Sequence, residues 1–377
     1  MKIAFDSKRL FNNPTGLGNY SRTIVLNFAK FFTNQNIYLC APKIKKNKLN
    51  EAFLQDKRYK IIQKLKKTPF WRSYFIINDL KKDKIEIYHG LSNEIPINIH
   101  KSGIKSIVTI HDLIFKVYPS TYKFTDRWIY DFKFKYACKK ADVVLAISEA
   151  TKKDIIKYYK ITPEKIQVVY QACQDVFYDT KEDFTTQMEF ENLNLPKKYM
   201  VYVGSVITRK NVIQLLQAFK EIPQQQKIPL VIVGKGSDYY QKCVDFVNQN
   251  NLKDMVIFKN NIHNNAILKL VYKHALFSVY PSVYEGFGLP VVESLLCNTP
   301  VITSSVSSMP EAGGNGALYC APNDISTLTQ NMVKLIEDEN LRNELVKNGK
   351  EYIQTNFNPE KLSSQLYSIY QNLITQN

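Results

Sequence analysis

Long hydrophobic runs are missing from this sequence. No apolar stretch approaches the roughly 18 residues that a membrane-spanning helix needs, and only three apolar residues separate Met1-Lys2 from Asp6, too few for the core of a signal peptide. The six cysteines are dispersed, with no Cys-x-x-Cys pair. These absences favour a reduced, cytoplasmic protein without a cysteine-bound metal.

Acidic residues are scarce in the first half of the chain. Residues 1–180 hold 33 Lys and Arg against 16 Asp and Glu, a net charge of +17, whereas residues 181–377 hold 18 of each kind. The whole positive excess therefore lies in the first half. Such a basic half predicts an anionic partner, which could be nucleic acid, an acidic membrane surface or a phosphorylated substrate.

Two loops begin like the dinucleotide-binding fingerprint Gly-x-Gly-x-x-Gly but lack its third glycine. Ser21 stands in its place after Gly16-Leu-Gly18, and Tyr239 does so after Gly234-Lys-Gly236. A nicotinamide site is therefore not favoured.

Short apolar runs alternate with helical patterns, which indicates parallel sheets of the α/β class. In the first half, strands are expected at 2–7, 36–41, 85–89, 106–111, 143–147 and 166–170. In the second half they are expected at 199–203, 230–233, 256–258, 276–280 and 301–303. The polar run 179–194 between the halves is interpreted as a linker. This predicts two domains, 1–178 and 196–357, followed by a helical segment at 358–377.

The stretch 279–314 has the features of a ligand-binding loop. An apolar run long enough for a buried strand leads to Gly286 and Gly288, and Pro290 stands where a helix can start. Glycines let backbone amides approach a bound hydroxyl or phosphate, and a helix N-terminus favours negative charge. Glu285 and Glu293 flank this loop. The alternative is that Glu285 is solvated and that Glu293 only complements its helix dipole.

Two cations precede a predicted helix in the second half. The strand at 199–203 ends in Gly204-Ser205 and leads through Arg209-Lys210 into a helix from about residue 212 to 220. A helix start that carries Arg and Lys can bind a diphosphate. An exposed helix start without a ligand is the alternative.

Two histidines stand at the carboxyl ends of predicted strands in the first half, His89 and His111, the second of them preceding Asp112. Ligands of doubly wound sheets bind at the carboxyl ends of the strands. A single histidine is more often structural, so both interpretations stay open here.

The string Glu285-Gly-Phe-Gly-Leu-Pro-Val-Val-Glu293 resembles the Glu-x7-Glu motif of the retaining glycosyltransferases of family 4, and most of all bacterial mannosyltransferases of polysaccharide and lipopolysaccharide assembly. The flanks Pro281-Ser282, Pro300-Val-Ile-Thr303 and Pro310-Glu311 match as well. The resemblance implies the GT-B fold, in which two Rossmann-like domains face each other across a cleft. The first would bind the acceptor and the second the nucleotide sugar, and the C-terminal helix would cross back to the first domain.

The same resemblance implies transfer of a hexose from a nucleotide sugar with retention of configuration. Without an Asp-x-Asp pair of the kind that metal-dependent transferases use, Arg209, Lys210 and a helix dipole should replace a metal. The implied catalytic residues are His111, which would approach the transferred sugar, Glu285, Arg209 and Lys210. The implied donor-binding residues are Gly16, Gly18, Gly204, Ser205, Arg209, Lys210, Gly234, Glu285, Gly286, Phe287, Gly288, Leu289 and Glu293. His89 and Asp112 are expected to contact the acceptor.

GDP-mannose is the expected donor, with a UDP-sugar as the alternative, and no other cofactor is expected. The acceptor would be a glycan or a lipid-linked glycan. A nucleotide-sugar epimerase of the same fold is a second hypothesis. A non-catalytic nucleic-acid binder is a third, which is less favoured because the lysines come without a recognisable nucleic-acid motif.

The segment 43–84 combines lysines with aromatic residues. It is predicted to form an amphipathic surface helix, broken at Pro69, that rests on anionic lipid headgroups at the inner membrane face. A solvated helix whose aromatic residues pack into the domain is the alternative. The basic residues in question are Lys57, Arg58, Lys60, Lys64, Lys66 and Lys67, and the apolar ones are Tyr59, Ile61, Ile62, Leu65, Phe70 and Trp71.

Overall fold

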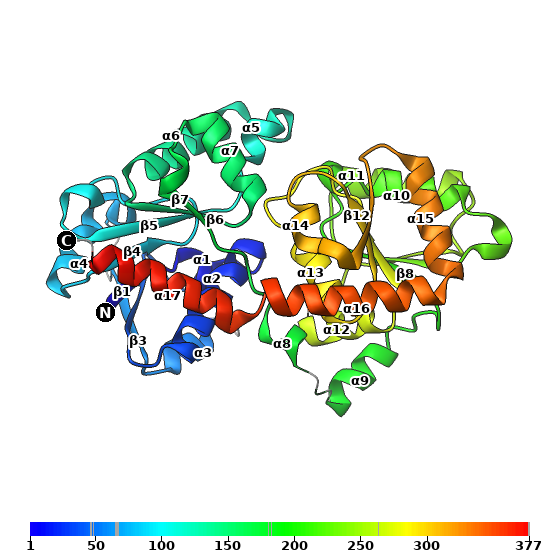
Figure 1. Ribbon diagram of the computed structural model, residues 1–377, viewed down its shortest axis with the longest axis horizontal. Coiled ribbons are helices and arrows are strands. Elements are labelled where there is room, and N and C mark those ends of the chain that lie inside the picture. Colours follow the sequence, from blue (N-terminus) through cyan, green and yellow to red (C-terminus); the bar gives the residue numbers. More distant parts are fainter. Residues whose placement is uncertain are drawn as a thin grey trace. The chain divides into compact units, whose positions relative to one another are not determined.

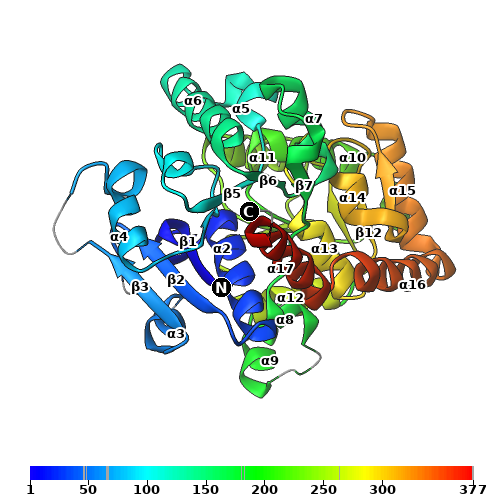
Figure 2. The ribbon, with the colours of Figure 1, turned by 60° about the vertical axis from the view of Figure 1, so that its left-hand side comes forward.

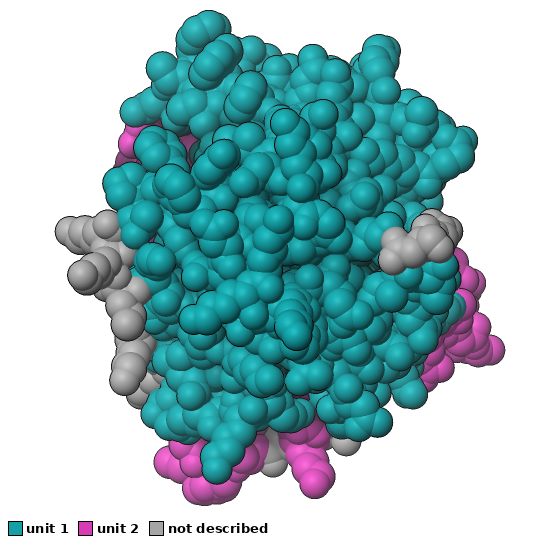
Figure 3. Space-filling view, turned by 90° about the vertical axis from the view of Figure 1, so that its left-hand side faces the viewer, with its two compact units in different colours: residues 1–172, 358–377 teal, residues 173–357 magenta. Residues whose placement is uncertain are grey.

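The chain forms two compact units, each built around one parallel β-sheet (Figures 1 and 3). The structure is a computed structural model that describes residues 1–45, 47, 49–64, 68–179, 181, 183–262 and 264–375. Unit 1 comprises Met1–Ala172 and Asn358–Asn377, and unit 2 comprises Cys173–Phe357. Among the described residues, no helix has the length and the apolar composition that crossing a bilayer requires.

The sheet of unit 1 has the strand order β3-β2-β1-β4-β5-β6-β7, with parallel pairing between the described strands. Its strands are β1 (Lys2–Asp6), β2 (Asn36–Ala41), β3 (Tyr59–Gln63), β4 (Ile87–Gly90), β5 (Lys105–Ile110), β6 (Val143–Ala146) and β7 (Ile166–Val168). Its helices are α1 (Lys8–Asn12), α2 (Gly16–Phe31), α3 (Glu51–Gln55), α4 (Ile76–Lys82), α5 (Ile114–Val117), α6 (Phe124–Lys140), α7 (Glu149–Tyr159) and α17 (Pro359–Thr375). Central strands such as β1 are apolar on both faces because helices cover both sides of the sheet.

The C-terminal helix α17 is part of unit 1, where it lies beside α2 (Figure 2). The rings of Phe32 and Tyr367 stack with their centroids 4.2 Å apart, and Tyr370 meets Phe28 edge-on at 5.3 Å. Tyr370 is fully buried. The apolar face of α17 therefore completes the core of a unit whose other residues are Met1–Ala172.

Unit 2 has the strand order β10-β9-β8-β11-β12-β13, again with parallel pairing. Its strands are β8 (Met200–Val203), β9 (Leu230–Val233), β10 (Val256–Lys259), β11 (Phe277–Tyr280), β12 (Val301–Ser304) and β13 (Ala317–Cys320). Its helices are α8 (Asp175–Tyr178), α9 (Phe184–Glu191), α10 (Val212–Glu221), α11 (Asp238–Gln249), α12 (Asn265–Lys273), α13 (Leu289–Leu296), α14 (Met309–Gly313), α15 (Ile325–Glu337) and α16 (Glu339–Asn356). The expected α/β class is confirmed for both units.

The expected amphipathic helix within 43–84 is wrong, because residues 59–63 form the edge strand β3, paired with β2. Tyr59, Ile62 and Trp71 are buried, and the indole Nε1 of Trp71 donates to Asp79 Oδ2 at 2.7 Å. These side chains are therefore unavailable to lipid. Lysines on an edge strand discourage pairing with another sheet. Leu65, Lys66 and Lys67 lie outside the described residues.

The polar run interpreted as a linker contains the helix α9, which packs against α12 in unit 2. Asp183 caps this helix by accepting a hydrogen bond from the Thr186 amide at 2.9 Å, and Phe190 stacks on His274. The preceding α8 also belongs to unit 2, where the Tyr178 hydroxyl donates to the Phe357 carbonyl at 2.9 Å. The N-terminal unit thus ends at Ala172, before the expected boundary at residue 178.

Candidate active site

The strand order of unit 2 brings two loops together that are far apart in the sequence. Direction along the sheet reverses between β8 and β11, which are hydrogen-bonded neighbours. In open α/β sheets, ligands bind at the carboxyl ends of the strands at such a reversal. The loop after β8 holds a 3₁₀ turn, Thr208–Lys210, and the loop after β11 holds Glu285.

At this point the Glu285 carboxylate is paired with both cations that precede α10. The Arg209 guanidinium lies 2.8 Å from Glu285 Oε2, and the Lys210 ammonium donates to Oε1. The same Oε1 accepts hydrogen bonds from Ser282 Oγ at 2.7 Å and from the Tyr280 hydroxyl at 3.1 Å. We call these five residues the Glu285 cluster.

The Glu285 cluster is largely shielded from solvent, with side-chain exposures of 14% for Arg209, 12% for Lys210 and 10% for Glu285. Burial alone would raise the pKa of Glu285. The charges of Lys210 and Arg209, with hydrogen bonds from Lys210 and Ser282, outweigh burial and lower this pKa to about 2. Glu285 is therefore ionised at neutral pH, and with both cations it leaves one net positive charge.

Backbone contacts fix the two loops against each other. The Arg209 carbonyl accepts a hydrogen bond from the Val283 amide at 3.0 Å, and Ser282 Oγ lies 3.1 Å from the same carbonyl. The Lys210 ammonium also donates to the Tyr280 hydroxyl. The cations are therefore held in place before any ligand arrives.

The glycine loop after Glu285 has a fixed backbone. Gly288 has φ +120° and precedes α13, where Pro290 stands in the first turn, and a Cβ on Gly288 would lie 2.5 Å from Met309 Cε. Ser307 donates to the Glu285 carbonyl at 2.6 Å. Ser308 donates to the Phe287 carbonyl at 2.6 Å, and its Oγ lies 3.0 Å from the Glu285 carbonyl.

The side chains of this loop do not all face outward. Phe287 is buried, with its ring 5.4 Å from that of Phe357, so its backbone is the part that remains for a ligand. Gly286 is buried as well, whereas Leu289 is half-buried at the start of α13.

Glu293 lies one turn further along α13 and is held by different groups. It is half-buried, and its Oε2 accepts a hydrogen bond from the Tyr272 hydroxyl at 3.5 Å. Burial raises the pKa of Glu293 to about 7, although the Tyr272 hydrogen bond opposes this shift. The two glutamates of the motif thus differ in charge near neutral pH.

Gly204 and Gly234 let the ends of β8 and β9 touch. A Cβ on Gly234 would lie only 1.9 Å from the Gly204 carbonyl oxygen, so no other residue fits there without a shift of the backbone. Val206 and Gly236 then form a single parallel bridge. Ser205, between these contacts, is exposed.

In unit 1, His89 is inside the core instead of facing an acceptor. It has no exposed surface, and its Nδ1 and Nε2 lie 2.7 Å from the Tyr370 hydroxyl and 2.8 Å from Thr109 Oγ1. Thr109 Oγ1 in turn lies 3.0 Å from the Tyr20 hydroxyl. Burial, with a smaller effect of His111, lowers the pKa of His89 to about 3. The expected acceptor contact of His89 is therefore replaced by a structural role.

His111 lies at the end of β5 with 5% of its surface exposed. Its Nε2 lies 2.9 Å from the Leu91 carbonyl, which can only accept, so Nε2 carries the proton and Nδ1 a lone pair. Burial lowers the pKa of His111 to about 4, against the effect of the Leu91 hydrogen bond. The Tyr20 ring meets the imidazole edge-on at 4.6 Å. His111 is thus a neutral, oriented imidazole.

The remaining predicted residues of unit 1 lie at the starts of two helices, α5 and α2. Asp112 accepts a hydrogen bond from the Ile114 amide at 3.0 Å at the start of α5. Gly16 and Gly18 lie in the first turn of α2, the first exposed and the second buried.

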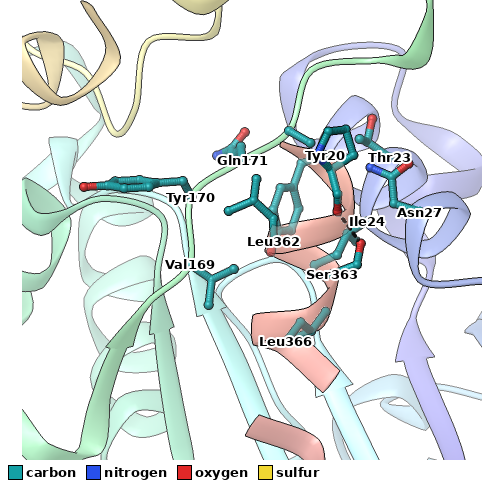
Figure 4. Close-up of a pocket in the computed structure, with 12 residues that line it drawn as sticks. Tyr20, Thr23, Ile24, Asn27, Val169, Tyr170, Gln171, Leu362, Ser363 and Leu366 are labelled. Carbon is teal, nitrogen blue, oxygen red and sulfur yellow. Dashed lines mark hydrogen bonds between the residues drawn. The ribbon is translucent and has the colours of Figure 1, made fainter. Parts of the chain in front are cut away.

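Unit 1 also has a cavity that none of the expected site residues lines (Figure 4). It lies between α2, the segment after β7 and α17. Its lining consists of Tyr20, Thr23, Ile24, Asn27, Val169, Tyr170, Gln171, Ala172, Pro359, Leu362, Ser363 and Leu366.

Sequence reasoning missed several residues that build the site. Tyr280 and Ser282 hold the carboxylate, and Ser307 and Ser308 hold the loop. Ser282 lies within a stretch that matched the family motif, so its position was a usable signal. The serines at 307 and 308 carried no such signal, because their partners are backbone carbonyls on another loop. Among the described residues, no three His, Cys, Asp or Glu side chains gather as they would around a metal ion.

Two family models match the chain, one in each unit. The model described as Glycosyltransferase Family 4 matches residues 21–173, and the model described as Glycosyl transferases group 1 matches residues 183–352. A solved structure of Anabaena Alr3699/HepE in complex with UDP superposes with a TM-score of 0.75 at 15% identity, covering 99% of this chain and 100% of that chain. The chain belongs to the glycosyltransferases of the GT-B fold.

Two curated relatives of this glycosyltransferase carry more specific names. The O-antigen chain mannosyltransferase B of Escherichia coli is 25% identical over 367 residues, which is 91% of this chain and 92% of the relative. The O-antigen chain mannosyltransferase RfbU of Salmonella typhimurium is 34% identical over 230 residues, which is 61% of this chain and 60% of the relative.

Proposed function

We propose that this glycosyltransferase transfers mannose from GDP-mannose to a growing glycan of the O-antigen class, with retention of configuration and without a metal. The Glu285 cluster carries the proposal, because it places two oriented cations where a doubly wound sheet binds its ligand. The names of the two curated relatives support mannose and the acceptor class. The UDP in the HepE structure keeps a UDP-sugar as the alternative donor.

Arg209 and Lys210 would bind the diphosphate of the donor. As the glycosidic bond breaks, negative charge develops on the leaving nucleoside diphosphate, and oriented cations in a shielded site stabilise it without reorganisation. Glu293 would accept hydrogen bonds from the ribose, and the amides of 286–289 would face the sugar and phosphate. Gly204, Ser205 and Gly234 are proposed to line the nucleotide, and Gly16 and Gly18 remain predicted contacts of its phosphates.

Donor binding would work as an exchange of partners at Glu285. An ionised carboxylate offers about four acceptor positions; Lys210, Ser282 and Tyr280 share Oε1, and Arg209 pairs with Oε2. When a diphosphate attracts the two cations, Glu285 loses two partners and can accept hydrogen bonds from sugar hydroxyls instead. Recognition of the phosphate would thereby prepare recognition of the sugar.

On the acceptor side, His111 and Asp112 are the proposed contacts. The lone pair on Nδ1 of a neutral His111 can accept a hydrogen bond from a sugar hydroxyl. For the transfer itself, attack on the same face of the sugar as the leaving phosphate, with that phosphate as the base, would retain the anomeric configuration.

The test is an assay of the purified protein with GDP-mannose, UDP-glucose and UDP-galactose, each with a mannose-containing oligosaccharide acceptor and EDTA. We expect transfer from GDP-mannose in EDTA, with an α-anomeric product by NMR. Loss of activity in EDTA that magnesium restores would contradict the metal-free mechanism. Release of an isomeric nucleotide sugar without acceptor would instead identify an epimerase.

A further inference from the structure

The solvent face of α6 is unusually apolar for a helix of this charged unit. Phe124, Trp128 and Phe132 are 76%, 68% and 58% exposed. Their spacing of four residues places them along one side of the helix, and the rings of Trp128 and Phe132 stack with their centroids 6.3 Å apart. Ile129 is also exposed. A contiguous apolar patch of this kind marks an interaction site.

Packing within unit 1 does not require these exposed side chains. The opposite side of α6 holds the helix in place through Phe134, Ala137 and Cys138, all buried. Phe134 meets Phe115 at 5.3 Å, edge-on. The helix thus has one apolar side for its own core and a second apolar side that faces solvent.

Basic residues outnumber acidic ones on the exposed side. At about 3.6 residues per turn, Lys135 and Lys139 fall among the three aromatic rings of α6. Lys140 falls beside Ile129. All three lysines are exposed. Asp126 falls on another side of the helix, whereas Asp131 falls beside Phe124 at the margin of the rings, where it is paired with Lys116 at 2.7 Å. We define the α6 face as Phe124, Trp128, Ile129, Phe132, Lys135, Lys139 and Lys140.

We propose that the α6 face docks on an anionic lipid surface. Aromatic rings and isoleucine would enter the headgroup boundary, and the lysines would lie among the lipid phosphates. Charge complementarity selects this partner, because residues 1–180 carry the whole net charge of +17 and Asp131, at the margin of the α6 face, is already paired with Lys116. A protein partner fits less well, since lysine is depleted at the centres of protein interfaces. The proposal concerns docking and does not depend on which sugar is transferred.

The two tryptophans of the chain make the proposal directly measurable. Trp128 is exposed, whereas Trp71 is 2% exposed and hydrogen-bonded to Asp79. With vesicles of phosphatidylglycerol and phosphatidylcholine, the emission of the full-length protein should shift to the blue and become shielded from iodide. The Trp128→Phe variant, which keeps Trp71 and an aromatic ring on the face, should bind the vesicles without this shift.

Charge-reversal variants locate the surface. Lys135→Glu with Lys139→Glu should weaken binding to anionic vesicles by about tenfold or more in co-sedimentation. The control is Lys57→Glu with Lys60→Glu, which changes the net charge by the same amount at two exposed lysines near β3. This variant should weaken vesicle binding much less. Trp128→Ala with Phe132→Ala should also weaken binding, whereas Phe184→Ala, at an 80% exposed ring on α9, should leave it unchanged.

Several outcomes would overturn the proposal. One is no blue shift with anionic vesicles at low salt, and another is an equal shift with pure phosphatidylcholine. A third is equal loss of binding in the two charge-reversal variants. Shielding of Trp128 by self-association without vesicles, seen in sedimentation velocity, would make the α6 face a protein interface instead.

Discussion

At the scale of single residues, Glu285 connects stability with ligand binding. Its carboxylate is the counter-charge for two shielded cations, Arg209 and Lys210. Removing one partner of a buried ionic group leaves the remaining charges uncompensated, which costs about 3 kcal/mol or more. A bound diphosphate can supply that missing negative charge, so the effect of a substitution at Glu285 should depend on whether a ligand is present.

Glu285→Gln should therefore lower the unfolding temperature and reduce transfer by a factor on the order of 10². Addition of GDP should raise the unfolding temperature more in this variant than in the wild type, because both cations have then lost the carboxylate that neutralises them and the diphosphate replaces its charge. Thermal denaturation with and without GDP measures both effects. The control is Glu344→Gln, at an exposed carboxylate of α16. It should change neither the unfolding temperature nor its response to GDP. A smaller GDP response in the variant would count against the partner exchange.

Glu293 should make stability depend on pH in the opposite sense to an ion-paired carboxylate. Its pKa rises from an ordinary 4.5 to about 7 on folding. Between these values the unfolded chain loses the proton while the folded chain keeps it, so stability falls as pH rises toward 7. Above pH 7 Glu293 is ionised in both states, and the loss of stability from its burial reaches its full size.

Glu293→Gln should remove this cost. The variant and the wild type should be equally stable at pH 4, and the variant should be more stable at pH 8, by up to about 3 kcal/mol. Urea denaturation at the two pH values measures the difference. If Glu293 binds the ribose, the same variant should bind GDP more weakly. Equal stability differences at both pH values would show that Glu293 ionises normally.

At the scale of elements, α17 is attached to the sheet of unit 1 by a buried polar chain as well as by aromatic packing. The chain runs from Tyr370 through His89 and Thr109 to Tyr20, and Tyr20 contacts the His111 ring. It therefore connects α17, β4, β5 and α2 with a proposed acceptor contact. A buried polar chain of this kind is costly to interrupt, because each unpaired group stays desolvated.

Tyr370→Phe should lower the free energy of unfolding by about 1–3 kcal/mol, because it leaves His89 Nδ1 buried without its partner. Tyr59→Phe is a matched control, since the buried Tyr59 hydroxyl has no hydrogen-bond partner among the described residues and its removal should cost little. Chemical denaturation of both variants gives the comparison. Equal losses in the two would mean that the His89 contact contributes nothing specific.

At the scale of the whole molecule, unit 1 is discontinuous in the sequence and unit 2 is continuous. A fragment of residues 1–172 lacks α17 and exposes the apolar surface that Leu366 and Tyr370 cover. A fragment of residues 173–357 keeps its own core. The two fragments should therefore behave differently when they are produced alone.

We expect residues 173–357 to give a soluble fragment with a cooperative thermal transition by circular dichroism, and residues 1–172 to aggregate. Joining 358–377 to residue 172 by a short Gly-Ser linker should restore folding, because Ala172 and Pro359 line the same cavity. Variation of the linker length is the control. A cooperative transition in residues 1–172 alone, at the temperature of the linked fragment, would contradict the role of α17.

Local patterns in the sequence were sufficient for most of the strands and for the charged residues of unit 2. Parallel strands covered on both faces must be short apolar runs, and those runs are visible without a structure. The strands β2 and β9 were predicted with the bounds that the structure has. Glu285, Arg209 and Lys210 were found because they follow strands, where ligand-binding loops lie. The structure adds that these three residues contact one another.

Only the tertiary structure decided which side of a segment is buried and which distant group it meets. The spacing of three between Tyr59 and Ile62 suits one face of a helix, yet pairing with β2 made this segment a strand, in which the two side chains point to opposite faces. His89 became structural because Tyr370, near the other end of the chain, packs against it. The aromatic residues of α6 were exposed because Phe134, Ala137 and Cys138 already fill its contact with the core. Local sterics and the spacing of apolar residues determine where most helices and strands form. Which of their side chains are buried depends on strand order and on packing between residues far apart in the sequence.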